Sequence, residues 1–385
     1  MSRTLCLLSL LACACSGGGN SPTDGGPQCT TIDGVCLNAP LAVATRTQCG
    51  DVTDFCDKSG MPPQLSCLTT PKVPGAGPAM VTLTGFIDVF SNGPNANGIS
   101  VAVYDAVPLL GGQDISTATP IAQLASVVLD PATQRACDAD GKFGCSLPSH
   151  TGCTLPVCND GLDGRADSTK YCRDNGGNFV CSDRLRWEAR YTLPVMVPTN
   201  KPLVVRVTGA NGLPDQNWAN LVVWNVFLST SDHACVGLED NDCIDVAKTT
   251  YQLNVNALSK TDYVNIPVTS GLSGGIAVGR GAVAGEVHDC DNVRLENVVV
   301  GMNPIAERSS YFNGNPIKTL PDSSRVATDR LGLFTGLNLP PGKVTVVAAG
   351  LTSVGGPLVP FGTYAGYIYP DTVSVINLNE GHPKQ

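Results

Sequence analysis

Hydrophobic and polar positions alternate along much of the chain after residue 80. In the segment 80–89, MVTLTGFIDV, every second position from Val81 to Val89 is apolar or glycine, and three of the four positions between them are threonine or aspartate. A period of two is typical of a strand with one buried face, so we expect a β-strand here and a return strand at 99–103. The same pattern predicts further strands at 121–129, 186–193, 202–207, 220–228 and 263–268.

A second series of the same kind begins near Gly281. Its predicted order is a strand at 282–287, a turn at 289–294, a strand at 295–300, a turn at 339–342 and a strand at 344–348. The two series share their layout, which indicates an internal repeat. The first copy is longer because a cysteine-rich insertion, at about 137–185, interrupts it.

Four short motifs mark the second copy: G-x-V-x-D at 285–289, L-x-N-V-x-V at 295–300, T-D-x-x-G-x-F at 328–334 and L-P-P-G at 339–342. With them, residues 280–350 resemble the carboxypeptidase regulatory-like (transthyretin-like) β-sandwich, and residues 80–210 match it more loosely. The resemblance implies a mainly β fold with two antiparallel β-sandwich domains, transthyretin-like or immunoglobulin-like. The turn glycines and prolines suit the tight corners of such a sandwich.

The N-terminus has the pattern of an export signal. Arg3 precedes an apolar run at 5–12 that is too short to span a bilayer. The sequence Leu-Leu-Ala-Cys that ends at Cys13 resembles the lipobox of bacterial lipoproteins, which implies a lipidated cysteine and a lipid-anchored, exported protein. Because Asp does not follow Cys13, analogy with enteric lipoproteins favours the outer membrane or cell surface.

Cysteine parity favours a different lipidated residue. Lipidation of Cys13 leaves Cys15 and the fourteen later cysteines, an odd number, whereas lipidation of Cys15 leaves an even number. The lipobox, with Leu10 three residues before the cysteine, is the more specific signal. Cys13 is therefore preferred and Cys15 is kept as the alternative.

Seventeen cysteines in an exported chain predict a disulfide framework. No Cys-x-x-Cys pair occurs, which argues against a zinc cluster. Pairing within local groups leaves five cysteines between 29 and 67, six between 137 and 181, the pair Cys235 and Cys243, and Cys290 alone. Since five and one are odd, we expect one N-terminal cysteine to cross to Cys290.

Composition agrees with an all-β exported protein and excludes some partners. Charged residues make up 15% of the chain, below the ~25% of ordinary globular proteins, while Gly (42) and Pro (28) are abundant. The net charge of −9 argues against nucleic acid as a partner. After the signal region, the chain has no apolar stretch long enough to span a membrane.

Together these features divide the chain into six segments. They are a lipoprotein signal peptide with its lipobox (1–15), a flexible tether (16–28), a cysteine-rich segment and hinge (29–78), the first β-sandwich with its insertion (79–270), a linker (271–279) and the second β-sandwich (280–385). The tether is predicted because it has almost nothing apolar to bury. Residues 29–68 are expected to form disulfide-held loops with little regular structure.

Candidate chemistry is sparse. The resemblance implies an accessory domain without its enzyme, since none of the four histidines belongs to a His-x-x-Glu or His-Glu-x-x-His motif. Ser273 lies in a Gly-x-Ser-x-Gly stretch, but this hinge is predicted to lack the strand and helix of a nucleophile elbow. The glycines at 279–285 run directly into a strand and so favour turns over a dinucleotide site. The chain is therefore predicted not to be an enzyme.

Two candidate binding sites remain. Asn159, Asp160, Asp163 and Asp167 lie in a Cys-flanked, Asp/Gly-rich stretch that could supply oxygens to Ca²⁺, although a disulfide-bounded turn is favoured and no cofactor is otherwise expected. Trp218, in a polar, turn-like setting, is the candidate surface tryptophan for contact with a glycan, whereas Trp187 and Trp224 are expected in the core.

The sequence thus predicts a non-catalytic cell-envelope lipoprotein that presents β-sandwich domains for structural or adhesive interactions. Its expected partners are the membrane, through the N-terminal lipid, and an envelope protein or polysaccharide. The alternatives are a carbohydrate-binding module, because the family is grouped with carbohydrate-binding-like folds, and a serine hydrolase at Ser273.

Overall fold

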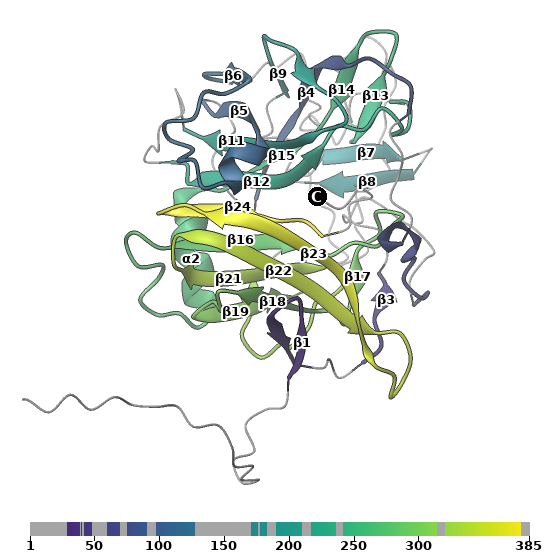
Figure 1. Cartoon of the computed structure of the whole chain (residues 1–385), viewed down its shortest axis with the longest axis vertical. Coiled ribbons are helices and arrows are strands. Elements are labelled where there is room, and N and C mark those ends of the chain that lie inside the picture. The colour runs from purple at the N-terminus through teal and green to yellow at the C-terminus, as the bar shows by residue number, and fades with distance from the viewer. Residues whose placement is uncertain are drawn as a thin grey trace, which may run out of the picture.

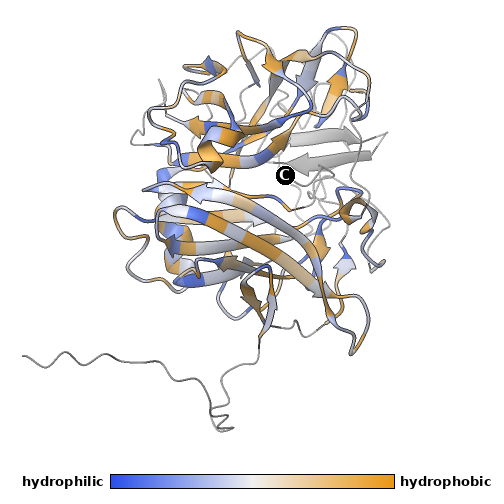
Figure 2. Cartoon of the chain, viewed as in Figure 1, coloured by the Kyte–Doolittle hydropathy of each residue, from blue (hydrophilic) through white to orange (hydrophobic). Residues whose placement is uncertain are grey.

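The computed structural model describes residues 29–38, 40, 42–47, 60–69, 75–90, 98–127, 171–175, 178–182, 190–209, 217–235, 242–313 and 320–378. This part of the chain is mainly β, as predicted, and its strands form several sheets (Figure 1). Its helices are α1 (Ala106–Leu110), α2 (Lys260–Thr269) and the 3-10 turn η1 (Ser66–Leu68). Apolar residues recur along the strands of both halves (Figure 2).

The first half is organised around β4 (Met80–Val89), one of the predicted strands. Its sheet contains β9 (Arg190–Thr192), β10 (Val197–Pro198), β13 (Cys243–Asp245), β14 (Thr250–Gln252) and β15 (Val255–Ala257). Facing strands are β5 (Ser100–Asp105), β6 (Ala122–Leu124), β11 (Pro202–Thr208) and β12 (Asn220–Phe227), which pair antiparallel with one another. A separate hairpin, β7 (Tyr171–Asn175) and β8 (Asn178–Ser182), falls within the predicted insertion.

The second half repeats this plan. Its central strand is β16 (Gly281–Glu286), in a sheet with β19 (Arg308–Phe312), β20 (Pro321–Asp322), β21 (Leu333–Leu339) and β24 (Thr372–Val375). The other sheet is an antiparallel set of β18 (Val299–Asn303), β22 (Gly342–Leu351) and β23 (Leu358–Ile368). The order β18-β22-β23 corresponds to β5-β11-β12 in the first half.

The two central strands share one unusual position. Gly85 in β4 lies opposite Tyr191, and Gly285 in β16 lies opposite Phe334, so each glycine faces an aromatic residue on its antiparallel neighbour. A Cβ at Gly85 would lie 2.0 Å from the carbonyl oxygen of Leu253, and one at Gly285 would lie 2.0 Å from that of Ile376. Both strands therefore need glycine for the same close backbone approach, which supports the internal repeat.

Strand β24 joins the halves. It pairs in parallel with β16 on one side and with β12 on the other, so that nine strands form a single sheet in the order β20-β19-β21-β16-β24-β12-β11-β5-β6. Each face of this sheet is buried in a core that draws residues from both halves. The predicted domain boundaries remain a prediction. Strands from both sides of the predicted linker at 271–279 belong to this one sheet.

One predicted strand is wrong. Residues 263–268 belong to the helix α2, whose N-terminus is capped by Ser259: its hydroxyl accepts a hydrogen bond from the Asp262 amide at 3.0 Å. Val264 and Val268 lie exposed on the helix surface. The alternation at 263–268 predicted a strand, but the Ser-x-x-Asp cap at 259–262 stabilises the start of a helix and outweighs so short an alternation.

Replacing the repeated glycines should weaken the fold. We predict that Gly285→Ala and Gly85→Ala each lower the free energy of unfolding by about 1–3 kcal/mol, because the added methyl group overpacks against a backbone carbonyl. Urea unfolding measures this, with Gly274→Ala as the control, since a Cβ at Gly274 has nothing within 4 Å. Equal midpoints for the Gly274 and Gly285 variants would contradict the repeat geometry.

Candidate functional site: the N-terminal junction

The described residues between 29 and 69 pack on the second half, although the first half follows them in sequence. Strand β3 (Thr45–Arg46) pairs antiparallel with β17 (Leu295–Glu296), and the Ala44 amide donates to the carbonyl oxygen of Leu351 at 2.9 Å. The hairpin of β1 (Thr30–Ile32) and β2 (Val35–Leu37) is closed by the disulfide Cys29–Cys36.

This packing has its own small core. Val35 and Leu37 are buried against Val299, Val347 and Ala349 from the sheet of the second half. A Cβ at Gly301 would lie 2.6 Å from a methyl carbon of Leu37, so a side chain at this strand position would displace the hairpin. The segment expected to be loops thus contributes three short strands and a buried apolar contact.

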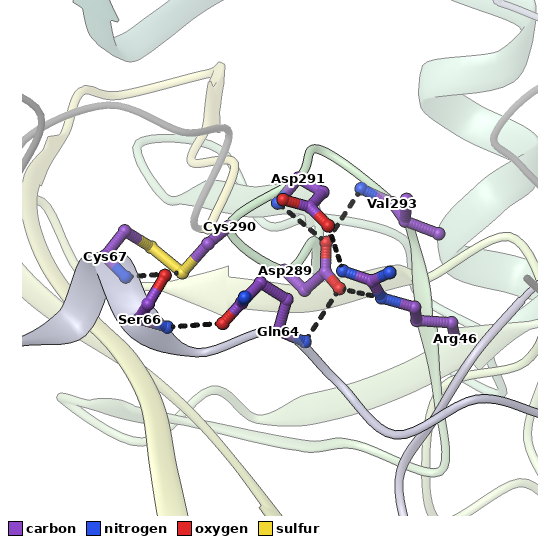
Figure 3. A network of polar contacts seen from close by, with 8 residues as sticks. All are labelled: Arg46, Gln64, Ser66, Cys67, Asp289, Cys290, Asp291 and Val293. Atoms are coloured by element: carbon purple, nitrogen blue, oxygen red, sulfur yellow. Dashed lines mark hydrogen bonds and ion pairs between the residues drawn. A yellow bond between two sulfur atoms is a disulfide. The ribbon is translucent and has the colours of Figure 1, made fainter.

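A disulfide fixes the same contact covalently. Cys67 is bonded to Cys290, 223 residues further along the chain, which confirms that an N-terminal cysteine crosses to Cys290. The Cys290 amide donates to the Gln64 carbonyl at 2.9 Å, and the Cys67 amide lies 3.0 Å from the Cys290 sulfur (Figure 3). The predicted local pair Cys235–Cys243 is also present.

Beside the disulfide lies a fully buried carboxylate. Asp289 has no exposed side-chain surface and accepts backbone hydrogen bonds from Gln64 at 3.0 Å, Asp291 at 3.0 Å and Val293 at 3.1 Å. Arg46, which is itself buried, donates to Asp289 and also to Asp291 (Figure 3). We call Arg46, Gln64, Cys67, Asp289, Cys290 and Asp291 the N-terminal junction.

The charges of the junction are mutually compensated. Burial by itself would lower the pKa of the Arg46 guanidinium, but its hydrogen bonds to Asp291 and Asp289 outweigh burial and raise that pKa. A buried charge that loses its partner typically costs a folded protein about 3–5 kcal/mol. The Asp289 carboxylate therefore requires that Arg46 and the backbone of residue 64 stay in place, which ties the N-terminal segment to the second half.

A second ion pair lies at the end of β16. Arg294 binds both carboxylate oxygens of Glu286 at 2.8 Å, and His288 Nε2 lies 2.9 Å from one of them. Burial alone would raise the pKa of Glu286, but the charge of Arg294 and the contact with His288 outweigh it and lower the pKa to about 2. The pair holds the chain on both sides of the 288–294 loop that carries Asp289.

Chemically, the junction is a structural joint. The oxygens of Asp289 accept hydrogen bonds from four donors. The carboxylate is therefore not available to act as a base or nucleophile. Within the described ranges, no group of three or more His, Cys, Asp or Glu residues is arranged to hold a metal ion. Likewise, no helix among the described residues combines the length and apolar character that a membrane crossing needs.

Several predicted site residues lie outside the described residues. These are the lipidation candidates Cys13 and Cys15, the candidate Ca²⁺ ligands Asn159, Asp160, Asp163 and Asp167, and Trp187. Those assignments stay predictions. Trp224 is buried, as expected.

The expectation that Trp218 lies on the surface is wrong. Its side chain is 3% exposed and packs in the core of the first half, where residue 218 forms an isolated β-bridge with Ser259. The polar residues beside it suggested a turn, but this long-range pairing carries the indole inward. Burial removes the surface position on which the glycan hypothesis depended.

Ser273 does not have the surroundings of a nucleophile elbow. It is exposed in a turn that follows the helix α2 and precedes the strand β16, the reverse of the strand-turn-helix order that the motif requires. The glycines at 279–285 lead into β16, as predicted.

Comparison with known proteins adds little. No family model matches the chain, and no curated protein matches it. Among solved structures, the shaft pilin SpaA from Lactobacillus rhamnosus GG aligns with 80% of this chain and 98% of its own, at 8% identity and a TM-score of 0.17. A single-residue mutant of that pilin aligns with 78% and 96%, at 8% identity and a TM-score of 0.18. Scores this low support no argument about fold or function.

The junction residues were missed by sequence reasoning, apart from Cys290. Asp289 ends the G-x-V-x-D motif, which predicted only a turn, and its partners Arg46 and Gln64 belong to no motif and lie more than 200 residues away from it. The one available signal was the odd cysteine count, which pointed to Cys290 but not to its acidic neighbours, Asp289 and Asp291.

The Glu286 ion pair should make stability depend on pH. Its folded pKa, about 2, lies below the ordinary value of 4.5, so its stabilisation is complete above pH 4.5 and is lost as the pH falls towards 2. The shift corresponds to roughly 3 kcal/mol at neutral pH, at about 1.4 kcal/mol per pKa unit. We predict that Glu286→Gln is destabilised relative to the wild type at pH 7 and that the difference shrinks by pH 3. Denaturant unfolding across this range tests it; a difference independent of pH would contradict the pairing.

Proposed function

We propose that this protein is a non-catalytic lipoprotein of the bacterial cell envelope, anchored through Cys13 at the outer membrane or cell surface. It presents its β-sandwich modules for structural or adhesive contacts. The observation that carries the proposal is the N-terminal junction, which bonds the first described segment of the chain to the second half by a disulfide and a buried ion pair.

The junction suits a protein that is held by its N-terminus. A pull transmitted through residues 16–28 would act first on the β1–β2 hairpin and then on β3. Noncovalent contacts of so short a segment would peel away one after another, but the bond at Cys67 stops peeling before β4 is reached. The first half is thereby protected from load on the anchor.

The arrangement of the halves supports presentation. Figure 1 places β1 at one end of the long axis and β4, β9 and β14 at the other. An anchor that precedes β1 would therefore leave the first half farthest from its attachment point. Because β24 pairs with strands from both halves, the distal half is held to the proximal half through a continuous sheet.

Lipidation is the most direct test. The full chain would be expressed in a Gram-negative host, labelled with an alkynyl fatty acid and fractionated into membrane and soluble material. We predict that Cys13→Ala abolishes labelling and releases the protein from membranes, whereas the matched variant Cys15→Ala keeps both. Loss of labelling in the Cys15 variant alone would move the anchor to Cys15, and an unlabelled wild-type chain would contradict the proposal.

A further inference from the structure

The turn that connects β22 with β23 exposes an apolar tip. Val354 is 94% exposed, and Thr352, Ser353, Gly355 and Pro357 beside it are also exposed. The turn is internally hydrogen bonded, with the Gly356 amide donating to the Ser353 carbonyl at 3.0 Å. Val354 is therefore exposed to solvent on a turn in which part of the backbone hydrogen-bonding capacity is satisfied internally.

The hairpin carries no charge beyond Lys343 at its base. Between Lys343 and Asp371 the sequence contains no Asp, Glu, Lys, Arg or His. Lys343 pairs with Tyr367 at the base of the hairpin, and the tip lies at the far end of β22, roughly 30 Å away at about 3.3 Å per residue. An uncharged tip enters the region of lipid headgroups and acyl chains without the cost of desolvating an ion.

The tip also lies where the chain leaves towards its N-terminus. Residue 43 forms a parallel bridge with Leu351, and the Ala44 amide donates to the Leu351 carbonyl at 2.9 Å, so the N-terminal segment runs beside the start of the turn. In Figure 1, this turn and β1 lie at the same end of the molecule, opposite β4 and β14. Residues 16–28 reach at most roughly 45 Å when extended, which keeps an anchored body close to the bilayer.

We propose that the 351–359 turn is a membrane-contacting surface that inserts Val354 into the bilayer interface beside the lipid anchor. The proposal rests on the lipidation proposed above. One exposed valine does not recruit a soluble protein to lipid, but a tethered body samples the surface at high effective concentration, so a weak contact is enough to orient it. The contact directs the second half towards the membrane and the first half away from it.

Fluorescence from the turn tests this orientation. The full lipidated chain carrying Val354→Trp would be reconstituted into phosphatidylethanolamine–phosphatidylglycerol vesicles, with and without lipids brominated on their acyl chains. The matched control is Val278→Trp, because Val278 is also 94% exposed but lies next to Arg280, near the base of the hairpin. The wild-type chain supplies the background emission of the native tryptophans.

The expected result is a blue shift of the added emission in Val354→Trp and its quenching by brominated lipid, with neither effect in Val278→Trp. If the chain floats with the vesicles but neither variant is quenched, the turn proposal is overturned while the anchor stands. A blue shift in Val354→Trp without quenching by brominated lipid would indicate that the turn contacts another copy of the chain, and this result would also overturn the turn proposal. A wild-type chain that does not float with the vesicles would instead overturn the lipid anchor.

Discussion

The buried carboxylate of Asp289 fixes where the N-terminal segment meets the second half. Its charge is compensated by Arg46 from the N-terminal segment and by backbone amides, including that of Gln64. Since such a charge cannot be left unpaired in the interior, the second half folds with the N-terminal segment in place. The neighbouring disulfide Cys67–Cys290 makes that arrangement covalent.

This closure has a consequence for the whole architecture. The described chain starts with strands that pack on the second half, continues through the first half and then returns to form the second half. Strand β24 completes the connection by filling the gap between β12 and β16, and its parallel pairing on both sides gives a sheet with a shared core on each face. In the function proposed above, a body connected in this way would carry load from the anchor to the first half through covalent and paired-strand connections.

Sequence patterns predicted the local elements well. The hydrophobic pattern and the flanking turn residues identified β4, β5, β11, β12 and β16, although most positions of β5, β11, β12 and β16 are buried on both faces of the sheet. Cysteine parity predicted the crossing to Cys290, since an odd local group requires a distant partner. The same alternation failed at 263–268, where the Ser259 cap favours a helix, and local polarity failed at Trp218. The Arg46–Asp289 pair and the insertion of β24 depend on contacts distant in sequence, which no local pattern encodes.

The central claim is that the segment following the predicted tether is an integral part of the second half. Mass spectrometry of peptides from the non-reduced, full-length protein tests it most directly. The account predicts a peptide in which Cys67 is linked to Cys290. Recovery of Cys290 as a free thiol, or linked to any other cysteine, would contradict it.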